Sequence, residues 1–261
     1  MDHRTDHRTF SPFFRPRRRP GAGLRGICPP GTVLLRTLLL DAPVVGALLF
    51  APRLATAQLV DNGAFRLFLD GIEVGTEEFT IQRVGTGDAR RTFARGHVTM
   101  RDGRVLRTVL RMVGPTMVLE AYQATLTGTD TAAVEFVRAG DRLQGTIVER
   151  RRERMQEYRA DPTTVILEEG VAHHYFVLGL HTASGAPAAT LHAFAPLSER
   201  PEATIEIEAA PHALDLNGTA IETTRVLLGV GGRAGAAWFD GSGRLLRVEL
   251  FAQGFVALRL P

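Results

Sequence analysis

The chain has 261 residues, of which 44% are hydrophobic and 23% charged, a composition typical of globular proteins. All 31 basic residues are arginine, which excludes Schiff-base chemistry, a lysine nucleophile and the lysine of a P-loop. Because the single cysteine, Cys28, lies near the N-terminus, the rest of the chain can form neither an internal disulfide nor a thiolate metal site.

The charge is divided unevenly along the chain. Residues 1–57 hold nine arginines and three acidic residues, for a net charge of +6, whereas residues 58–261 hold 22 arginines and 25 acidic residues, for a net charge of −3. The formal charge of +3 therefore comes from the N-terminal segment. An acidic remainder of the chain disfavours nucleic-acid binding.

The N-terminal segment has the features of an export signal. An uncharged apolar run from Ala42 to Pro52 is followed by Ala55-Thr56-Ala57, the small-x-small pattern that precedes a signal-peptidase cut. The run is too short to span a bilayer, and Pro43 makes a core helix the less favoured alternative. We expect residues 1–57 to be a leader, with a disordered or mis-annotated start and a signal peptide cleaved after Ala57. The remainder would be periplasmic or secreted, with no integral membrane span.

From Ala64 onward the hydrophobic period is two, which predicts half-buried antiparallel strands. Between the runs stand pairs and clusters suited to tight hairpin turns. The clearest alternating runs are Ala64–Asp70, Glu78–Gln82, Ala203–Glu208 and Leu245–Leu250, and the clearest turns are Asp70-Gly71, Asp102-Gly103, Asn217-Gly218 and Asp240–Gly243.

These patterns predict that residues 58–261 form a single all-β domain. Its expected architecture is a curved antiparallel sheet forming a half-barrel or barrel, with at most one or two short helices. The run Gly170–Leu180 is the main ambiguous element, since its apolar residues fit either a short helix or a buried strand.

The histidines between His173 and His192 are the candidate metal ligands. His174, His181 and His192 could ligate a metal from neighbouring elements, with Glu168 or Glu169 as the carboxylate ligand. Their spacing matches no compact metal motif. In a strand, the adjacent His173 and His174 would also point to opposite faces. We therefore expect structural histidines and no cofactor, with a metal-dependent hydrolase as the alternative.

For two further segments we favour a structural explanation over a functional one. The glycine-rich run Gly229–Gly235 is followed by strand-like residues rather than a helix, so it predicts a hairpin loop and not a phosphate loop. The segment Glu149–Arg159 holds five arginines interspersed with three glutamates. It predicts a solvated strand or helix face, although its arginines could also contact an anionic partner.

Two hairpins resemble parts of a known class of proteins. The run WFDGSGRLLRVELFAQGFVALRL, from Trp238 to Leu260, resembles the closing hairpin of exported bacterial β-proteins of unknown function. The run LDGIEVGTEEFTI, from Leu69 to Ile81, resembles their first hairpin. Such proteins are similar to the periplasmic lipoprotein-carrier half-barrels, whose curved sheet holds acyl chains against its concave face. The resemblance implies a ligand-binding fold and supplies no catalytic residue.

These observations favour a binding protein over an enzyme. The expected function is that of an exported cell-envelope protein that binds an apolar or lipid-like ligand, such as an acylated molecule, on the concave face of the sheet. A structural envelope-assembly partner without a small ligand is the other alternative. The candidate residues that would line the ligand cavity are large and apolar: Phe65, Leu67, Phe79, Phe136, Tyr175, Phe176 and Trp238.

Overall fold

The computed structural model describes residues 57–183, 188–198, 201–216, 218–230 and 233–261. All of the expected leader except Ala57 therefore lies outside the described residues. The described chain is mostly strand, with one α-helix of eight residues, α1 (Phe176–Ala183), and three single-turn 3-10 helices, η1 (Gly87–Ala89), η2 (His173–Tyr175) and η3 (Phe251–Gln253). With eight residues, α1 is too short to cross a bilayer, and the described residues contain no longer helix.

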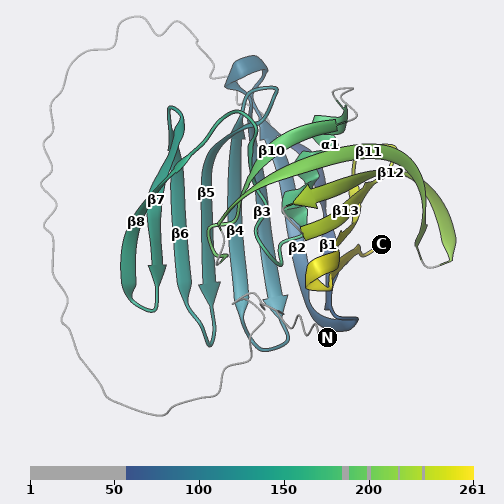
Figure 1. The fold of residues 1–261 in the computed structure, drawn as a ribbon, viewed down its shortest axis with the longest axis horizontal. Helices are drawn as coiled ribbons and strands as arrows, with labels where there is room; N and C mark the ends of the chain where they lie inside the picture. The colour runs from purple at the N-terminus through teal and green to yellow at the C-terminus, as the bar shows by residue number, and fades with distance from the viewer. Residues whose placement is uncertain (1–56, 184–187, 199–200, 217, 231–232) are drawn as a thin grey trace, which may run out of the picture.

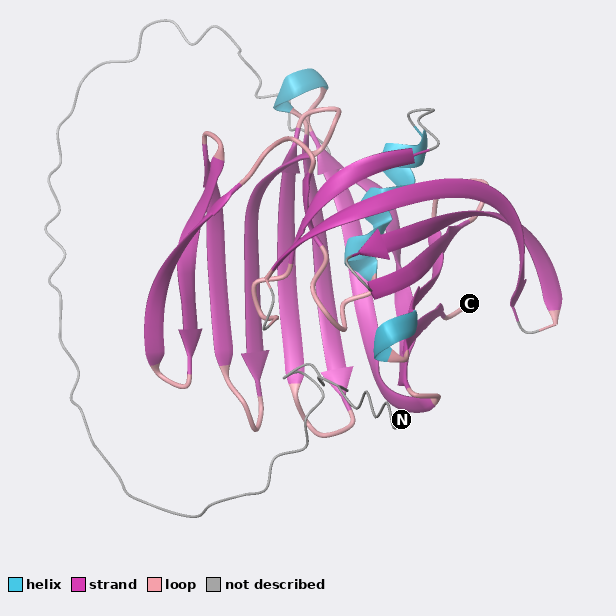
Figure 2. Ribbon diagram, in the orientation of Figure 1, coloured by secondary structure: helices cyan, strands magenta, loops and turns pink. Residues whose placement is uncertain are grey.

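The strands form one sheet of fifteen members (Figures 1 and 2). They are β1 (Gln58–Leu69), β2 (Ile72–Val84), β3 (Arg91–Met100), β4 (Val105–Val113), β5 (Val118–Thr127), β6 (Ala132–Ala139), β7 (Arg142–Glu149), β8 (Arg152–Arg159), β9 (Thr164–Ile166), β10 (Ala188–Phe194), β11 (Glu202–Leu216), β12 (Thr219–Val230), β13 (Arg233–Phe239), β14 (Leu245–Leu250) and β15 (Phe255–Arg259). This confirms the predicted all-β class.

The two ends of the described chain meet in the middle of the sheet. The strand order runs β8 to β1 and then β15 down to β9, and β1 pairs antiparallel with β15 from Phe65 opposite Arg259 to Leu69 opposite Phe255. An ion pair stabilises this junction, because the Arg259 guanidinium donates to both carboxylate oxygens of Asp61, at 2.7 and 2.9 Å. The sheet thus consists of two halves, β1–β8 and β9–β15, joined by the terminal strands.

The sheet is curved and does not close. Its half β9–β15 curls across the concave face of the half β1–β8 (Figure 1), and β9 packs against β5. The ring of Phe194 on β10 lies 5.2 Å from that of Phe136 on β6 and 4.4 Å from that of Tyr158 on β8, measured between centroids. The expected curved antiparallel sheet is confirmed, with the single exception that β9 and β10 pair in parallel.

The turns predicted at Asp70-Gly71, Asp102-Gly103 and Asp240–Gly243 lie between strands, whereas Asn217 of the fourth predicted turn lies outside the described residues. Asp70 and Gly71 have φ of 49° and 78°, the positive values that a two-residue hairpin loop between β1 and β2 requires. Asp240 accepts hydrogen bonds at Oδ1 from the backbone N–H groups of Ser242 and Arg244, which closes the turn between β13 and β14. Runs of alternating residues bounded by such turns are what made these hairpins recognisable.

Candidate functional site

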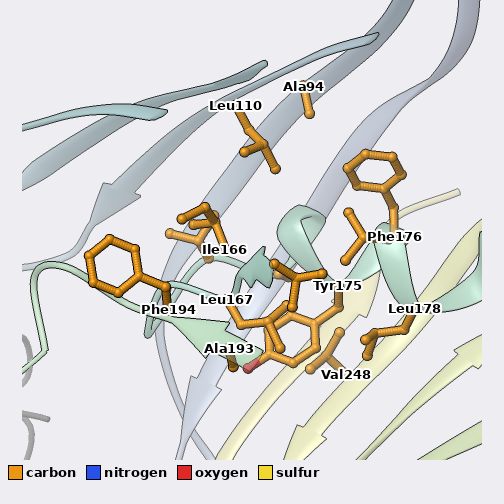
Figure 3. Close-up of a cluster of buried hydrophobic side chains, with 14 of the residues drawn as sticks. Ala94, Leu110, Ile166, Leu167, Tyr175, Phe176, Leu178, Ala193, Phe194 and Val248 are labelled. Carbon is orange, nitrogen blue, oxygen red and sulfur yellow. The ribbon is translucent and has the colours of Figure 1, made fainter. Parts of the chain in front are cut away.

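A continuous buried segment lies against the concave face of the sheet. Residues 164–178, here called the inner segment, are all buried and comprise β9, η2 and the start of α1. Figure 3 shows its side chains Ile166, Tyr175 and Leu178 between Leu110 of β4 and Val248 of β14. The ambiguous run Gly170–Leu180 is helical from His173 onward, and the inner segment fills much of the space that the curved sheet encloses.

A carboxylate on β2 holds the start of the helical part of this segment. Glu77 is fully buried, and its Oε2 accepts a hydrogen bond of 2.6 Å from the backbone N–H of Ala172. Its Oε1 accepts one of 3.2 Å from the backbone N–H of His173 and also contacts Nδ1 of the His173 ring. Since the N-terminal N–H groups of a helical segment have no partner within it, Glu77 acts as a cap supplied by the sheet.

Glu168 is a second buried glutamate, and it lies next to His174. Both oxygens of Glu168 lie 3.3 Å from the backbone N–H of Leu197, and Tyr122 Oη donates to Oε2 at 3.4 Å. The backbone N–H of Glu168 donates to Nδ1 of His174, also at 3.4 Å. An imidazole that accepts at Nδ1 carries its proton on Nε2, so this geometry favours neutral His174.

Burial shifts the pKa values of this cluster in opposite directions. It raises the pKa of Glu168 to about 8, and the charge of Glu169 adds to the rise. It lowers the pKa of His174 well below the ordinary value, assisted by the neighbouring His173. Both shifts favour the uncharged form, as expected of groups removed from water.

These pKa shifts predict how stability depends on pH. The raised pKa means that the contribution of Glu168 is fully present below the unfolded value of 4.5 and is lost as pH rises through about 8. His174 acts in the opposite sense, because its contribution is present above its unfolded value of 6.5 and is lost at lower pH. We therefore expect Glu168→Gln to become more stable relative to the unmodified protein, by a few kcal/mol, between pH 5 and pH 8.5.

Urea unfolding of both proteins at pH 5, 7 and 8.5 measures this difference. The exposed Glu78, changed to glutamine, is the matched control and should show no such trend. Parallel pH profiles for Glu168→Gln and the unmodified protein would contradict the assigned shift.

Several polar atoms of the cluster have no hydrogen-bond partner among the described residues. They include Nε2 of His173, Nε2 of His174 and Oγ1 of Thr108, all buried. The two imidazole rings pack edge to face with their centroids 4.5 Å apart, and the His173 ring also stacks on Phe79 at 5.9 Å. Because the surroundings exclude solvent, the cluster can hold the inner segment in place but offers no open position for a substrate.

The histidines do not converge on a metal site. His174 lies in the buried cluster, His181 lies on α1 beside a cavity, and Nε2 of His192 on β10 lies 3.5 Å from a carboxylate oxygen of Glu202. Within the described ranges, no group of three or more His, Cys, Asp or Glu side chains is placed to hold a metal ion.

Two cavities border the inner segment. The larger, here called the α1 cavity, has a volume of about 270 Å³ and lies between the β4–β5 hairpin and α1. Its lining is mostly apolar and includes two methionines, with threonines and His181 as the polar groups. A smaller cavity of about 70 Å³ lies on the other side, against Tyr175, Ile205 and Leu228. The residues around the α1 cavity are Leu110, Met112, Pro115, Thr116, Met117, Leu119, Pro162, Thr164, Val165, Ile166, Val177, Leu180 and His181.

The seven residues expected to line a ligand cavity are all buried, but they do not form one surface. Phe65, Leu67, Phe79, Phe136, Tyr175 and Phe176 belong to the main core, and Tyr175 also lines the smaller cavity. Trp238 belongs to a separate cluster with Leu214, Ala236 and Leu246, here called the outer cluster. Its neighbours Ala237 and Phe239 belong to the main core, so Trp238 points to the opposite face of β13, as strand alternation requires.

Sequence reasoning missed Glu77 and most residues around the α1 cavity, and it considered Glu168 only as a possible metal ligand. A signal for Glu77 is present, because the alternation that places Phe79 and Ile81 on one face of β2 also places Glu77 there. A glutamate on an apolar face requires a buried partner. The sequence carries no signal for the buried contacts of Glu168, because its partners come from β5 and the segment after β10.

Comparisons with known proteins find a likeness in structure but none in sequence. No protein-family model matches the chain, and no curated protein matches it. Among solved structures, the chain is similar to the crystal structure of a beta-barrel-like protein of domain of unknown function DUF1849 from Brucella abortus. The TM-score is 0.45 and the sequence identity 11%, over 79% of this chain and 95% of that one.

Proposed function

We propose that this chain is an exported cell-envelope protein that binds an apolar, lipid-like ligand on the concave side of its sheet, in the α1 cavity. The α1 cavity is the observation that carries the proposal, because it is apolar, bordered by a helix, and close in size to the small end of the usual ligand-cavity range of roughly 300–1,000 Å³. A cavity of this volume suits a short acyl chain or the end of a longer one.

The chemistry of the cavity lining supports such a ligand. Met112 and Met117 are flexible, polarisable side chains that adapt to ligands of different shape. Burial lowers the pKa of His181, which favours its neutral form. The site therefore offers little charge to a ligand, and an uncharged or weakly polar chain is the class that fits it.

Export rests on the N-terminal pattern and on where the sheet begins. A cut after Ala57 would leave all fifteen strands intact, because β1 begins at Gln58. The charge pattern agrees with removal of residues 1–57, which carry the excess of arginine. The periplasm or the exterior of the cell is then the compartment in which the ligand is met.

One experiment tests both parts of the proposal. We expect native mass spectrometry of the protein, recovered after expression of the full chain, to give a polypeptide that begins at Gln58 with an additional lipid-sized mass that is lost on denaturation. Leu180, 37% exposed at the cavity, can be enlarged without entering the core, so Leu180→Trp should reduce the bound fraction severalfold. Ile72→Trp, at a residue 69% exposed on β2, should leave it unchanged.

An envelope-assembly partner without a small ligand is the second candidate. The inner segment supports this function, because it occupies much of the concave face that a carrier would leave open. A bare polypeptide mass after gentle purification would favour this candidate and contradict ligand binding. A polypeptide that retains residues upstream of Gln58 would contradict the proposed cleavage, whether the protein binds a ligand or acts as an assembly partner.

A further inference from the structure

The two edges of the sheet are protected to different degrees. The edge strand β9 has three residues, all buried beneath the curled sheet. The edge strand β8 has eight, and its side chains are exposed except for partial burial of Gln156 and Tyr158. Figure 1 shows β8 at the free margin of the sheet. A long unpaired edge is a template for addition of another strand.

The backbone groups that such a strand would meet can be identified. The N–H of Ala160 donates to the carbonyl of Asp141 at 2.7 Å, so Ala160 directs its backbone groups toward β7. In an antiparallel pair these directions alternate, and the register of β7 with β8 has no shift. Glu153, Met155, Glu157 and Arg159 therefore direct their N–H and C=O groups outward, where no described residue pairs with them.

We propose that the free edge of β8 pairs antiparallel with β8 of a second copy of this chain, across a two-fold axis at Gln156. Only the outward-facing residues, which are every second residue of β8, can exchange hydrogen bonds with the second copy. The midpoint between any two of them is itself a residue, so the two-fold axis must pass through a residue of β8. With the axis at Gln156, Glu153 lies opposite Arg159 of the second copy, and by symmetry the same pair forms twice. Isologous pairing of this kind closes after two copies.

The side chains favour this register. Beyond the two Glu153–Arg159 pairs, Met155 lies opposite Glu157 and Arg154 opposite Tyr158, so no like charges face each other directly. Neither Glu153 nor Arg159 forms an ion pair with another described residue, which leaves both available. Pairing would also cover part of Met155, which is 84% exposed.

The neighbouring registers bring like charges together. An axis at Met155 places Glu153 opposite Glu157, an axis at Arg154 places that arginine opposite itself, and an axis at Glu157 places two glutamates face to face. Like charges directly opposite are destabilising. The charged residues of β8 thus select one partner register while discouraging indiscriminate pairing of the edge.

Sedimentation equilibrium of the protein expressed from the full chain tests this proposal over a range of concentrations. One strand pair makes a small interface, so we expect a concentration-dependent monomer–dimer equilibrium. Met155→Pro removes an outward N–H group without touching the β7 ladder and should abolish the dimer, whereas the matched Met155→Ala should retain it.

Charge reversal provides the decisive comparison. Glu153→Arg and Arg159→Glu should each raise the dimer dissociation constant about tenfold, because each places two like-charged pairs opposite one another. The double variant restores opposite charges and should return the constant close to its original value. A protein that stays monomeric at all concentrations overturns the proposal. A dimer whose dissociation constant is the same in all of these variants also overturns it. These outcomes are independent of whether the α1 cavity binds a ligand.

Discussion

Replacing Glu77 by alanine is expected to destabilise the protein by about 3–5 kcal/mol, the range seen when one partner of a buried polar pair is removed. The change leaves the N–H groups of Ala172 and His173 and the Nδ1 atom of His173 buried without their acceptor. Each buried group left without a partner costs about 1–3 kcal/mol of desolvation free energy. The free energy of unfolding, measured by urea denaturation at pH 7, tests this expectation.

The conservative variant and a neighbouring glutamate separate capping from a general effect of charge. Glu77→Gln keeps one acceptor oxygen and the shape of the side chain, so it should lose less stability than the alanine variant. Glu78, next along β2, is exposed on the other face, and Glu78→Ala should change stability by about 0.5 kcal/mol at most. Equal losses for Glu77→Ala and Glu78→Ala would show that Glu77 does not anchor the inner segment.

The strands of this fold are predictable because their signals are local. In β1 the inward residues Phe65 and Leu67 alternate with Arg66, and the two-residue turn at Asp70 and Gly71 ends the strand. Such a pattern specifies where a strand lies and which residues share a face. It leaves open which face is inward. For this reason the sequence places Trp238 among the residues expected to line the ligand cavity, although Trp238 belongs to the outer cluster.

The inner segment could not be placed from the sequence, because distant residues decide its position. Its apolar run fits a helix or a strand equally well, and the choice depends on Glu77, which caps Ala172 from 95 residues away in the chain. The α1 cavity has the same origin, since Met112 of β4 and Val177 of α1 meet only after the sheet has curled. Neither contact leaves a periodic signal along the chain.

The position of His173 also depends on a glycine, Gly96, which has no side chain. Gly96 on β3 faces the inner segment, and a Cβ atom built there would lie 2.7 Å from Nδ1 of His173 and 3.1 Å from Oγ1 of Thr108. The His173 ring cannot withdraw easily, because its Nδ1 contacts Glu77 and its face stacks on Phe79. Gly96 therefore provides the space in which the capped histidine sits.

Gly96→Ala is accordingly expected to cost about 3 kcal/mol, as overpacking of a rigid core combined with a weakened buried hydrogen bond. Gly229→Ala on β12 is the matched control, because its Cβ would meet nothing closer than the Glu206 carbonyl oxygen at 3.8 Å. That variant should be neutral within about 0.5 kcal/mol. Urea denaturation of both variants measures the difference.

If Gly96→Ala destabilises the protein because its methyl group collides with the His173 ring, removing that ring should relieve the collision. His173→Ala alone is destabilising, but combining it with Gly96→Ala should cost less than the sum of the two single changes, because the added methyl group then occupies space that the ring has left. Additive losses would place the strain of Gly96→Ala elsewhere in β3. A coupling of about 1 kcal/mol or more would show that Glu77, His173 and Gly96 together fix the inner segment against the sheet.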